Sequence, residues 1–236
     1  MHVAAPLEQN RLLASLPRCE YARLMCDLEP VRLEANRVLV VPGVPIGHVY
    51  FLRKAVVSLL VAMQDGSTIE GATVGNEGLV GLALFLGETT ANESMVVQIT
   101  GEAARMSAAA FHEALGHCAG LRLLLHRYTL ALMNQLARTA GCNRLHSVHQ
   151  RCSRWLLMSD DRLSGETIPI THECLAVLLG TRRASVSEAA EILRRAGLIE
   201  YRRGQISILD RAGLERAACE DYRMSKHAYD DNHGWV

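Results

Sequence analysis

The feature that most constrains the fold is a change in hydrophobic period near residue 112. Before it, short runs of Val, Ile and Leu alternate with turn signals such as Pro42-Gly43 and Asp65-Gly66, which is typical of many short strands. Beyond it, no proline interrupts residues 113–145, and apolar residues recur at spacings of three and four, as in an amphipathic helix. This order predicts an α+β chain.

The first part, residues 1–112, is expected to form a jelly-roll-like β-roll, or double-stranded β-helix, with a sensor-like role. The expected strands are residues 38–41, 49–52, 56–63, 69–74, 95–99 and 103–106. Two short helices, each stopped near a proline, are expected before them at residues 7–16 and 21–28.

The second part, residues 113–145, is expected to be a single long helix. Its seam is spaced 4-3-4-4, close to a heptad, and consists of Leu121, Leu125, Tyr128, Leu132 and Leu136. Such a seam favours a partner helix, so we expect a homodimer. The alternative is that the helix packs only on its own domain.

The third part, residues 146–223, has the order of a winged helix-turn-helix. Helices are expected at 150–162, 172–179 and 185–196, with a hairpin at 198–209. Thr171 is a good N-cap for the second of these, and Gly180 supplies the turn. Ser185 and Glu188 match a capping box for the third. A last helix could span 213–222, and residues 224–236 are expected to be a flexible tail.

The start of the second helix of a helix-turn-helix reads base edges in the major groove. Arginine suits this position because its guanidinium can pair with two acceptors on guanine, and serines there can donate to phosphates. Arginines at the hairpin tip are placed for backbone or minor-groove contact. The predicted DNA-binding set is Thr171, Arg182, Arg183, Ser185, Ser187, Glu188, Arg202 and Arg203.

Charge agrees with a local DNA-binding module. The whole chain has no net charge, which excludes the simplest signature of a nucleic-acid binder, but residues 144–205 hold ten arginines against seven acids. Residues 1–10 show no secretory pattern, and no apolar run approaches the roughly 20 residues that span a bilayer. We therefore expect a cytoplasmic protein without a membrane partner.

Neither the cysteines nor the histidines indicate catalysis. The seven cysteines are scattered and never form a C-x-x-C pair, so we expect reduced thiols and no metal or cofactor. Cys19, Cys26 and Cys118 could be imagined as a cluster set, although cluster proteins use tighter runs. His146 and His149 could share a helical face, but no H-E-x-x-H, G-x-S-x-G or phosphate loop accompanies them. No catalytic residue is expected.

Residues 170–189 resemble the helix-turn-helix of the Crp/Fnr regulators. Upstream, residues 42–52 look like the first hairpin of their cyclic-nucleotide-binding β-roll, and Gly75, Gly78 and Gly81 resemble the approach to its phosphate cassette. The resemblance implies a homodimer on double-stranded DNA with a palindromic operator, recruiting or obstructing RNA polymerase. Arg183 matches the family's leading base-reading arginine.

The expected effector pocket departs from the family's cyclic-nucleotide site. Members that bind cyclic nucleotides carry a Gly-Glu pair followed by Arg-Ser or Arg-Thr. Here the corresponding positions are Gly81, Leu82, Asn92, Glu93 and Ser94. Leucine cannot accept a hydrogen bond from ribose, and the Glu93 carboxylate would repel a phosphate. We therefore do not expect cyclic AMP as effector, and the effector is unknown.

Two alternatives remain open from the sequence. The chain could be a sensor or adaptor that acts through protein contacts, with a vestigial DNA module. It could also bind DNA without any small-molecule effector, so that its abundance alone sets its activity.

Overall fold

A computed structural model describes residues 10–163 and 165–230. Contacts divide the chain into two compact units. Unit 1 contains the described residues up to Leu59, Thr73–Met133, and Tyr229 with Asp230, whereas unit 2 contains Leu60–Ala72 and Asn134–Ala228. In the described part of the chain, no helix combines the length and the apolar character needed to cross a membrane.

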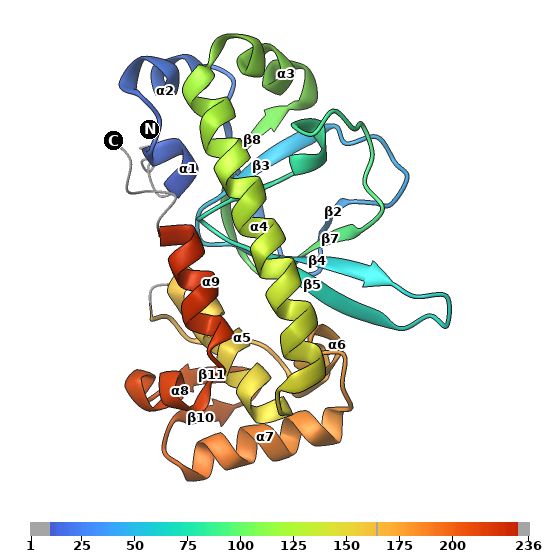
Figure 1. The fold of residues 1–236 in the computed structure, drawn as a ribbon, viewed down its shortest axis with the longest axis vertical. Coiled ribbons are helices and arrows are strands. Elements are labelled where there is room, and N and C mark those ends of the chain that lie inside the picture. Colours follow the sequence, from blue (N-terminus) through green and yellow to red (C-terminus); the bar gives the residue numbers. More distant parts are fainter. Residues whose placement is uncertain (1–9, 164, 231–236) are drawn as a thin grey trace. The chain divides into compact units, whose positions relative to one another are not determined.

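A strand-rich part is followed by a mainly helical part, as the change of hydrophobic period predicts (Figure 1). The first part contains α1 (Arg11–Ala14), α2 (Arg18–Leu24), β1 (Glu29–Leu33), β2 (Val38–Val40), β3 (His48–Leu52), β4 (Val56–Ala62), β5 (Thr68–Val74), β6 (Leu79–Val80), η2 (Leu82–Leu84), β7 (Ser94–Ile99), β8 (Gly101–Ser107) and α3 (Ala108–His117). The rest contains α4 (Ala119–Leu145), α5 (Val148–Leu163), β9 (Ile168–Pro169), α6 (His172–Leu178), α7 (Arg183–Arg195), β10 (Ile199–Arg202), β11 (Gln205–Ile208), α8 (Arg211–Ala217) and α9 (Asp221–Asp230).

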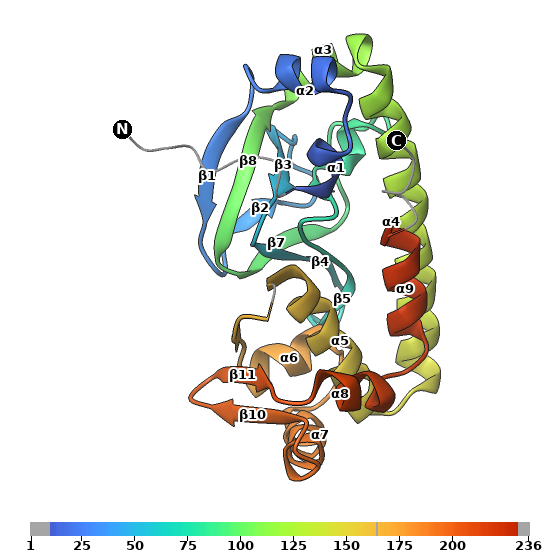
Figure 2. The ribbon, with the colours of Figure 1, turned by 90° about the vertical axis from the view of Figure 1, so that its left-hand side faces the viewer.

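The strands before α3 form two four-stranded sheets, β1-β8-β3-β6 and β2-β7-β4-β5. Figure 2 shows β1 and β8 side by side, and they are antiparallel with Glu29 opposite Arg105. Burial follows the period of two: Met95, Val97 and Ile99 of β7 are buried, and the residues between them are only partly covered. The predicted α+β fold with an N-terminal β-roll is confirmed, as are the six predicted strands, within two residues at each end.

The N-terminal elements differ from the expectation. The first predicted helix is reduced to α1, and residues 7–9 of that prediction lie outside the described part. The second ends at Leu24 because the chain then turns into β1, a strand that we did not predict. Pro30 is tolerated there because β1 is at the edge of its sheet, bonded only to β8.

The long helix begins at Ala119, later than residue 113. Residues 108–117 form a separate helix, α3, and Cys118 between the two has extended backbone angles (φ −108°, ψ 92°). The carboxylate of Glu20 on α2 accepts hydrogen bonds from the backbone N–H groups of Gly120 and Leu121, both at 3.0 Å. This external cap satisfies donors that the first turn of a helix leaves free, so α4 can start anew.

The predicted dimer seam does not lie on an exposed face of α4. Leu121, Leu125, Tyr128 and Leu132 are buried within the single chain, and only Leu136, 37% exposed, is accessible. These residues belong to the chain's own core. The helix carries a second set of apolar residues, which the sequence pattern alone did not distinguish from the first. The opposite face has a heptad run of exposed residues, here called the outer stripe: Leu123, His126, Leu130, Met133, Ala137, Ala140 and Arg144.

Residues 224–230 are helical where a tail was expected. α9 covers residues 221–230, whereas residues 231–236 of the predicted tail lie outside the described part. Tyr222, Ser225 and Tyr229 recur at spacings of three and four and are buried. In two views α9 runs alongside α4 (Figures 1 and 2). The polar residues on its exposed face concealed this periodicity.

In unit 2, α5 is the central element, buried along most of its length. The guanidinium of Arg211, at the start of α8, donates to the carboxylates of Asp160 and Asp161 on α5. It also donates to the Tyr222 hydroxyl of α9 at 2.7 Å. One side chain thus joins the three helices α5, α8 and α9.

Candidate nucleic-acid interface

The helix-turn-helix consists of α6, a tight turn and α7. Thr171 is the N-cap of α6 as predicted, because its hydroxyl accepts a hydrogen bond from the Cys174 N–H at 3.1 Å. Gly180 in the turn has φ +56°, a left-handed conformation that suits glycine. The backbone therefore reverses between α6 and α7 without strain.

The second helix starts two residues earlier than predicted. Arg182 is the N-cap residue of α7, and its carbonyl accepts the bond from Val186 N–H at 3.2 Å. The predicted capping box at Ser185 is therefore wrong, since Ser185 is already inside the helix and Glu188 is exposed. This shift places Arg183 and Ser185 in the first turn, at the positive end of the helix.

The predicted contact residues of α7 differ in how exposed their side chains are. Arg182, Arg183 and Glu188 are exposed, and the side chain of Arg183 is 71% accessible, with Glu173 at 3.6 Å. Ser185 is half-buried. Ser187 points differently, because its hydroxyl lies 3.0 Å from Nδ1 of His172 on α6. Ser187 therefore holds the two helices together in this structure.

His172 is a residue whose role sequence reasoning missed. Its ring stacks on Tyr201 of β10, with centroids 4.2 Å apart, and bonds Ser187 of α7. Burial, and then the charge of Arg183, lower the pKa of His172 below its ordinary value. The histidine thus links α6, α7 and the hairpin. Its partners are distant in sequence, so no local pattern indicates the role.

The hairpin β10–β11 carries the two predicted tip arginines. Arg203 and Gly204 form its turn, both with positive φ (+49° and +78°), as a type I′ turn requires. Arg202 and Arg203 are exposed, and Arg202 forms an ion pair with Glu200 at 2.8 Å. A third strand, β9, pairs with β11 and places Thr171 near this hairpin. The tip thus presents cationic side chains to solvent.

The other end of α7 is internally paired. Arg194 and Arg195 both donate to the carboxylate of Glu191, at 2.8 and 2.7 Å, and these bonds lower the pKa of Glu191 to about 2. The cations at the beginning of the helix are less tightly paired, since Arg183 is 3.6 Å from Glu173. This asymmetry matches the way such helices meet DNA.

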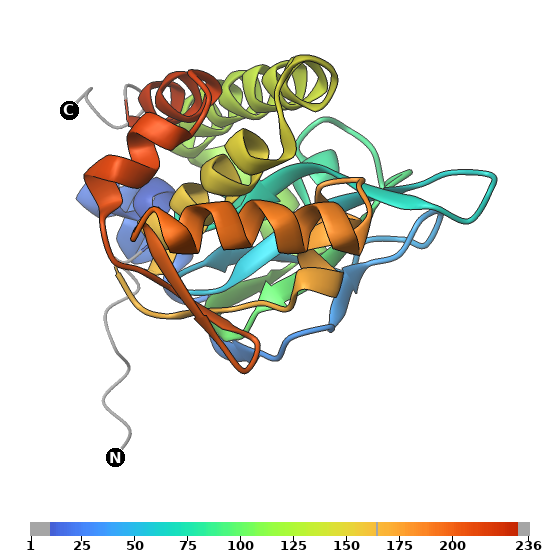
Figure 3. The same cartoon turned by 90° about the horizontal axis from the view of Figure 1, so that it is seen from below.

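The size and exposure of α7 suit a DNA groove. Figure 3 shows α7 crossing the face turned to the viewer, with the β10–β11 hairpin beside it. Thirteen residues make a helix of about 20 Å, and the major groove admits a helix. The positions predicted to contact bases, phosphates and the hairpin tip therefore lie in one unit of the structure.

The residues expected at an effector pocket lie in unit 1. Gly81 is buried with φ +96° and precedes η2, whose first residue, Leu82, is also buried. Asn92 is exposed, and Glu93 and Ser94 are half-buried at the start of β7. Leu82 adds an apolar side chain to the core.

Two family models match the chain in succession. A model for a cyclic nucleotide-binding domain matches residues 30–118, and one for a Crp-like helix-turn-helix domain matches residues 150–217. No curated protein sequence matches the chain.

Solved structures of this kind share the fold. FixK2 from Bradyrhizobium japonicum is 16% identical with a TM-score of 0.69, covering 81% of this chain and 98% of its own. TTHB099, a CRP-family transcriptional regulator from Thermus thermophilus, is 22% identical with a TM-score of 0.64, and the match covers 80% of this chain and 96% of TTHB099. The regulator CLP of Xanthomonas campestris, described as responsive to c-di-GMP, is 18% identical with a TM-score of 0.61, and the match covers 82% of this chain and 100% of CLP. With its cyclic nucleotide-binding domain followed by a Crp-like helix-turn-helix, the chain belongs to the Crp/Fnr family of DNA-binding transcription regulators.

Proposed function

We propose that this regulator binds a palindromic operator as a homodimer and reads base edges with the first turn of α7. The observation that carries the proposal is the exposed Arg183 in that turn, next to Arg182 and Ser185. A guanidinium there can pair with O6 and N7 of guanine. Arg202 and Arg203 at the hairpin tip would contact the backbone. Bound at a promoter, the dimer would recruit or obstruct RNA polymerase.

The outer stripe of α4 supports the dimer. Its residues follow heptad positions a and d, and Leu130 and Met133 near its middle are 61% and 60% exposed. Exposed large apolar side chains at this spacing are covered in a parallel or antiparallel helix pair. A second copy is the fitting partner, because two half-sites about 34 Å apart require two recognition helices.

The test is selection of random duplex DNA by the purified full chain, followed by sequencing. Enrichment of a two-fold symmetric motif is expected. Arg183→Ala should lower affinity for that motif by about 1–3 kcal/mol and relax the preference at one base position of each half-site. Arg195→Ala, the same change at the paired end of the helix, is the control and should keep the motif.

Two results would count against the proposal. If Arg183→Ala left affinity and base preference untouched, α7 would not read DNA in this manner. If neither the chain alone nor the chain with cell extract retained DNA above background, while the chain captured a specific protein, an adaptor role would replace it.

Cyclic AMP is not the effector in this proposal. The buried Leu82 offers no acceptor for ribose, and Glu93 adds negative charge near the place of a phosphate. Affinity for the selected motif should therefore be the same with and without saturating cyclic AMP. A rise of tenfold or more on adding cyclic AMP would contradict this assignment.

A further inference from the structure

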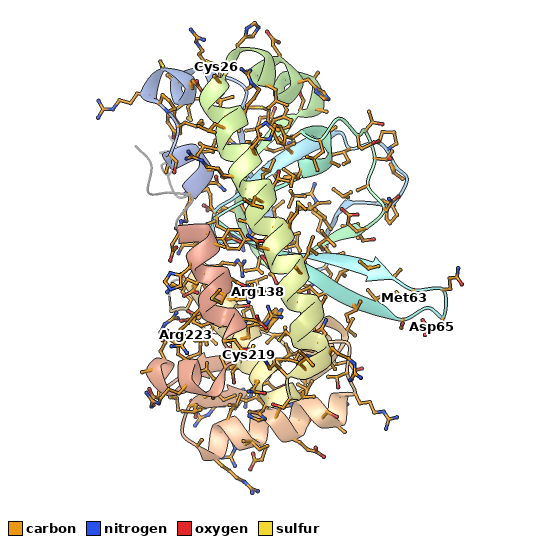
Figure 4. The ribbon with its side chains drawn as sticks, in the orientation of Figure 1. Cys26, Met63, Asp65, Arg138, Cys219 and Arg223 are labelled. Atoms are coloured by element: carbon orange, nitrogen blue, oxygen red, sulfur yellow. The ribbon has the colours of Figure 1, made fainter. Side chains whose placement is uncertain are left out.

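Four side chains that can bind a metal gather in unit 2, away from α7. Cys142 and His146 are one turn apart at the end of α4, and Cys219 and Asp221 lie where the chain enters α9. One ligand atom from each lies within 4.8 Å of all the others. Figure 4 labels Cys219 together with Arg138, which binds Asp221. Two chain segments distant in sequence thus meet at one point.

The two sulfur atoms have a separation that suits a shared metal. Cys142 Sγ and Cys219 Sγ are 3.5 Å apart, and both residues are buried. Two thiolates bound at about 2.3 Å with a tetrahedral angle lie about 3.8 Å apart. A few tenths of an ångström therefore separate the observed pair from the geometry of a metal site, whereas a disulfide at about 2.05 Å would need a larger movement.

The imidazole of His146 is oriented as a ligand. Its Nδ1 is buried without a hydrogen-bond partner and lies 3.4 Å from Asp221 Oδ2. Its Nε2 lies 3.4 Å from the carboxylate of Glu220. Metal-bound histidines commonly have this arrangement, with one nitrogen on the metal and the other donating to a carboxylate.

The residues around the four side chains orient Asp221, place positive charge near Cys142 and leave a cavity beside the cluster. Arg138 donates to Asp221 Oδ1 at 3.1 Å, which leaves Oδ2 toward the cluster. Arg151 and Arg154 are buried on α5, each with an Nε that has no hydrogen-bond partner, and both interact electrostatically with Cys142. A cavity of about 320 Å³, lined in part by His146 and Asp221, provides a route from solvent.

We propose that Cys142, His146, Cys219 and Asp221 bind one zinc ion per chain. Two thiolates, an imidazole and a carboxylate form a closed tetrahedral set, as in structural zinc sites, and the sulfur ligands select against magnesium and calcium. The ion ties the last turns of α4 to the start of α9. In this proposal Cys142 and Cys219 are metal ligands, whereas the sequence led us to expect reduced thiols and no metal.

The test measures zinc bound to the reduced full chain after equilibration with zinc chloride and dialysis against metal-free buffer. One zinc per chain is expected, and cobalt substitution should give the visible absorption of a tetrahedral thiolate site. Cys142→Ala and Cys219→Ala should each lose most of the zinc. Cys152→Ala, another buried thiol of unit 2, is the matched control and should retain it.

A second measurement does not depend on whether the variants fold. In the unmodified chain, zinc should protect two thiols from alkylation, and mass spectrometry should identify them as Cys142 and Cys219. The proposal is overturned if the reduced chain binds no stoichiometric zinc, if other cysteines are the protected ones, or if Cys142→Ala retains the metal. None of these results depends on DNA binding, so the proposed function and the zinc site can fail separately.

Discussion

Leu130 allows the strongest test of the outer stripe, because its contribution to a dimer can be worked out from its exposure. Leu130→Ala removes three carbon atoms, about 2.4 kcal/mol at about 0.8 kcal/mol per buried carbon. In the single chain 61% of the residue is exposed, so about 1.5 kcal/mol of that value depends on a partner. Both copies lose it, which gives about 3 kcal/mol, or roughly 100-fold weaker association.

The assay is sedimentation equilibrium over a wide concentration range, with the dimer Kd as the readout. Alanine and leucine both favour helix, so α4 should remain intact, as circular dichroism would verify. Leu145→Ala is the control: Leu145 is 79% exposed on the same helix but lies outside the stripe. Equal Kd values for Leu130→Ala and the unmodified chain, or equal weakening by Leu145→Ala, would refute the assignment of this face.

Three further predictions concern the tip of the hairpin, the histidine between the helices, and the β-roll. Arg203→Asn removes the charge but suits the left-handed turn, so binding should weaken for all DNA sequences alike and the salt dependence should fall by about one counterion per half-site; a change in base preference would contradict a backbone contact. Because the pKa of His172 is lowered in the fold, protonation favours the unfolded chain: the free energy of unfolding should fall as the pH drops through about 6.5 and level off below the lowered pKa. Denaturant titrations between about pH 8 and pH 5 should show a smaller fall in the free energy of unfolding for His172→Gln than for the unmodified chain. Identical pH dependence in the two proteins would show that His172 does not cause the fall. Gly101→Ala should lower unfolding stability by about 1–3 kcal/mol, because a Cβ there would meet the Ala55 backbone. Gly116→Ala, in a helix with open space around it, should not destabilise the chain; equal losses for the two variants would remove the steric explanation.

The parts of the fold that follow from local patterns were predictable. Strands such as β7 alternate buried and exposed residues, and Thr171 caps α6 through a bond to a residue three positions on. The order of helix, glycine turn, helix and hairpin also depends on neighbours in sequence. These features agree with the structure because the interactions that define them are short in range.

The features that were missed depend on long-range contacts. α4 is apolar on two faces, and only the packing of the chain shows that Leu125 is internal while Leu130 is exposed. The start of α7 was misplaced because Ser185 and Glu188 match a cap motif that the helix does not use. Cys142 and Cys219 are 77 residues apart, so no spacing motif joins them.

The two-faced character of α4 has a consequence for how the regulator responds to its own amount. If the chain dimerises through the outer stripe as proposed, a separated protomer keeps its core, since the inner face is covered by the same chain, and can persist as a folded species, unlike an obligate dimer. At concentrations below the dimer Kd, the dimer population then rises with the square of the total protein. Occupancy of an operator that is far from saturated would then change about fourfold for each doubling of the protein level, so expression level alone would act as an input, with or without a small molecule.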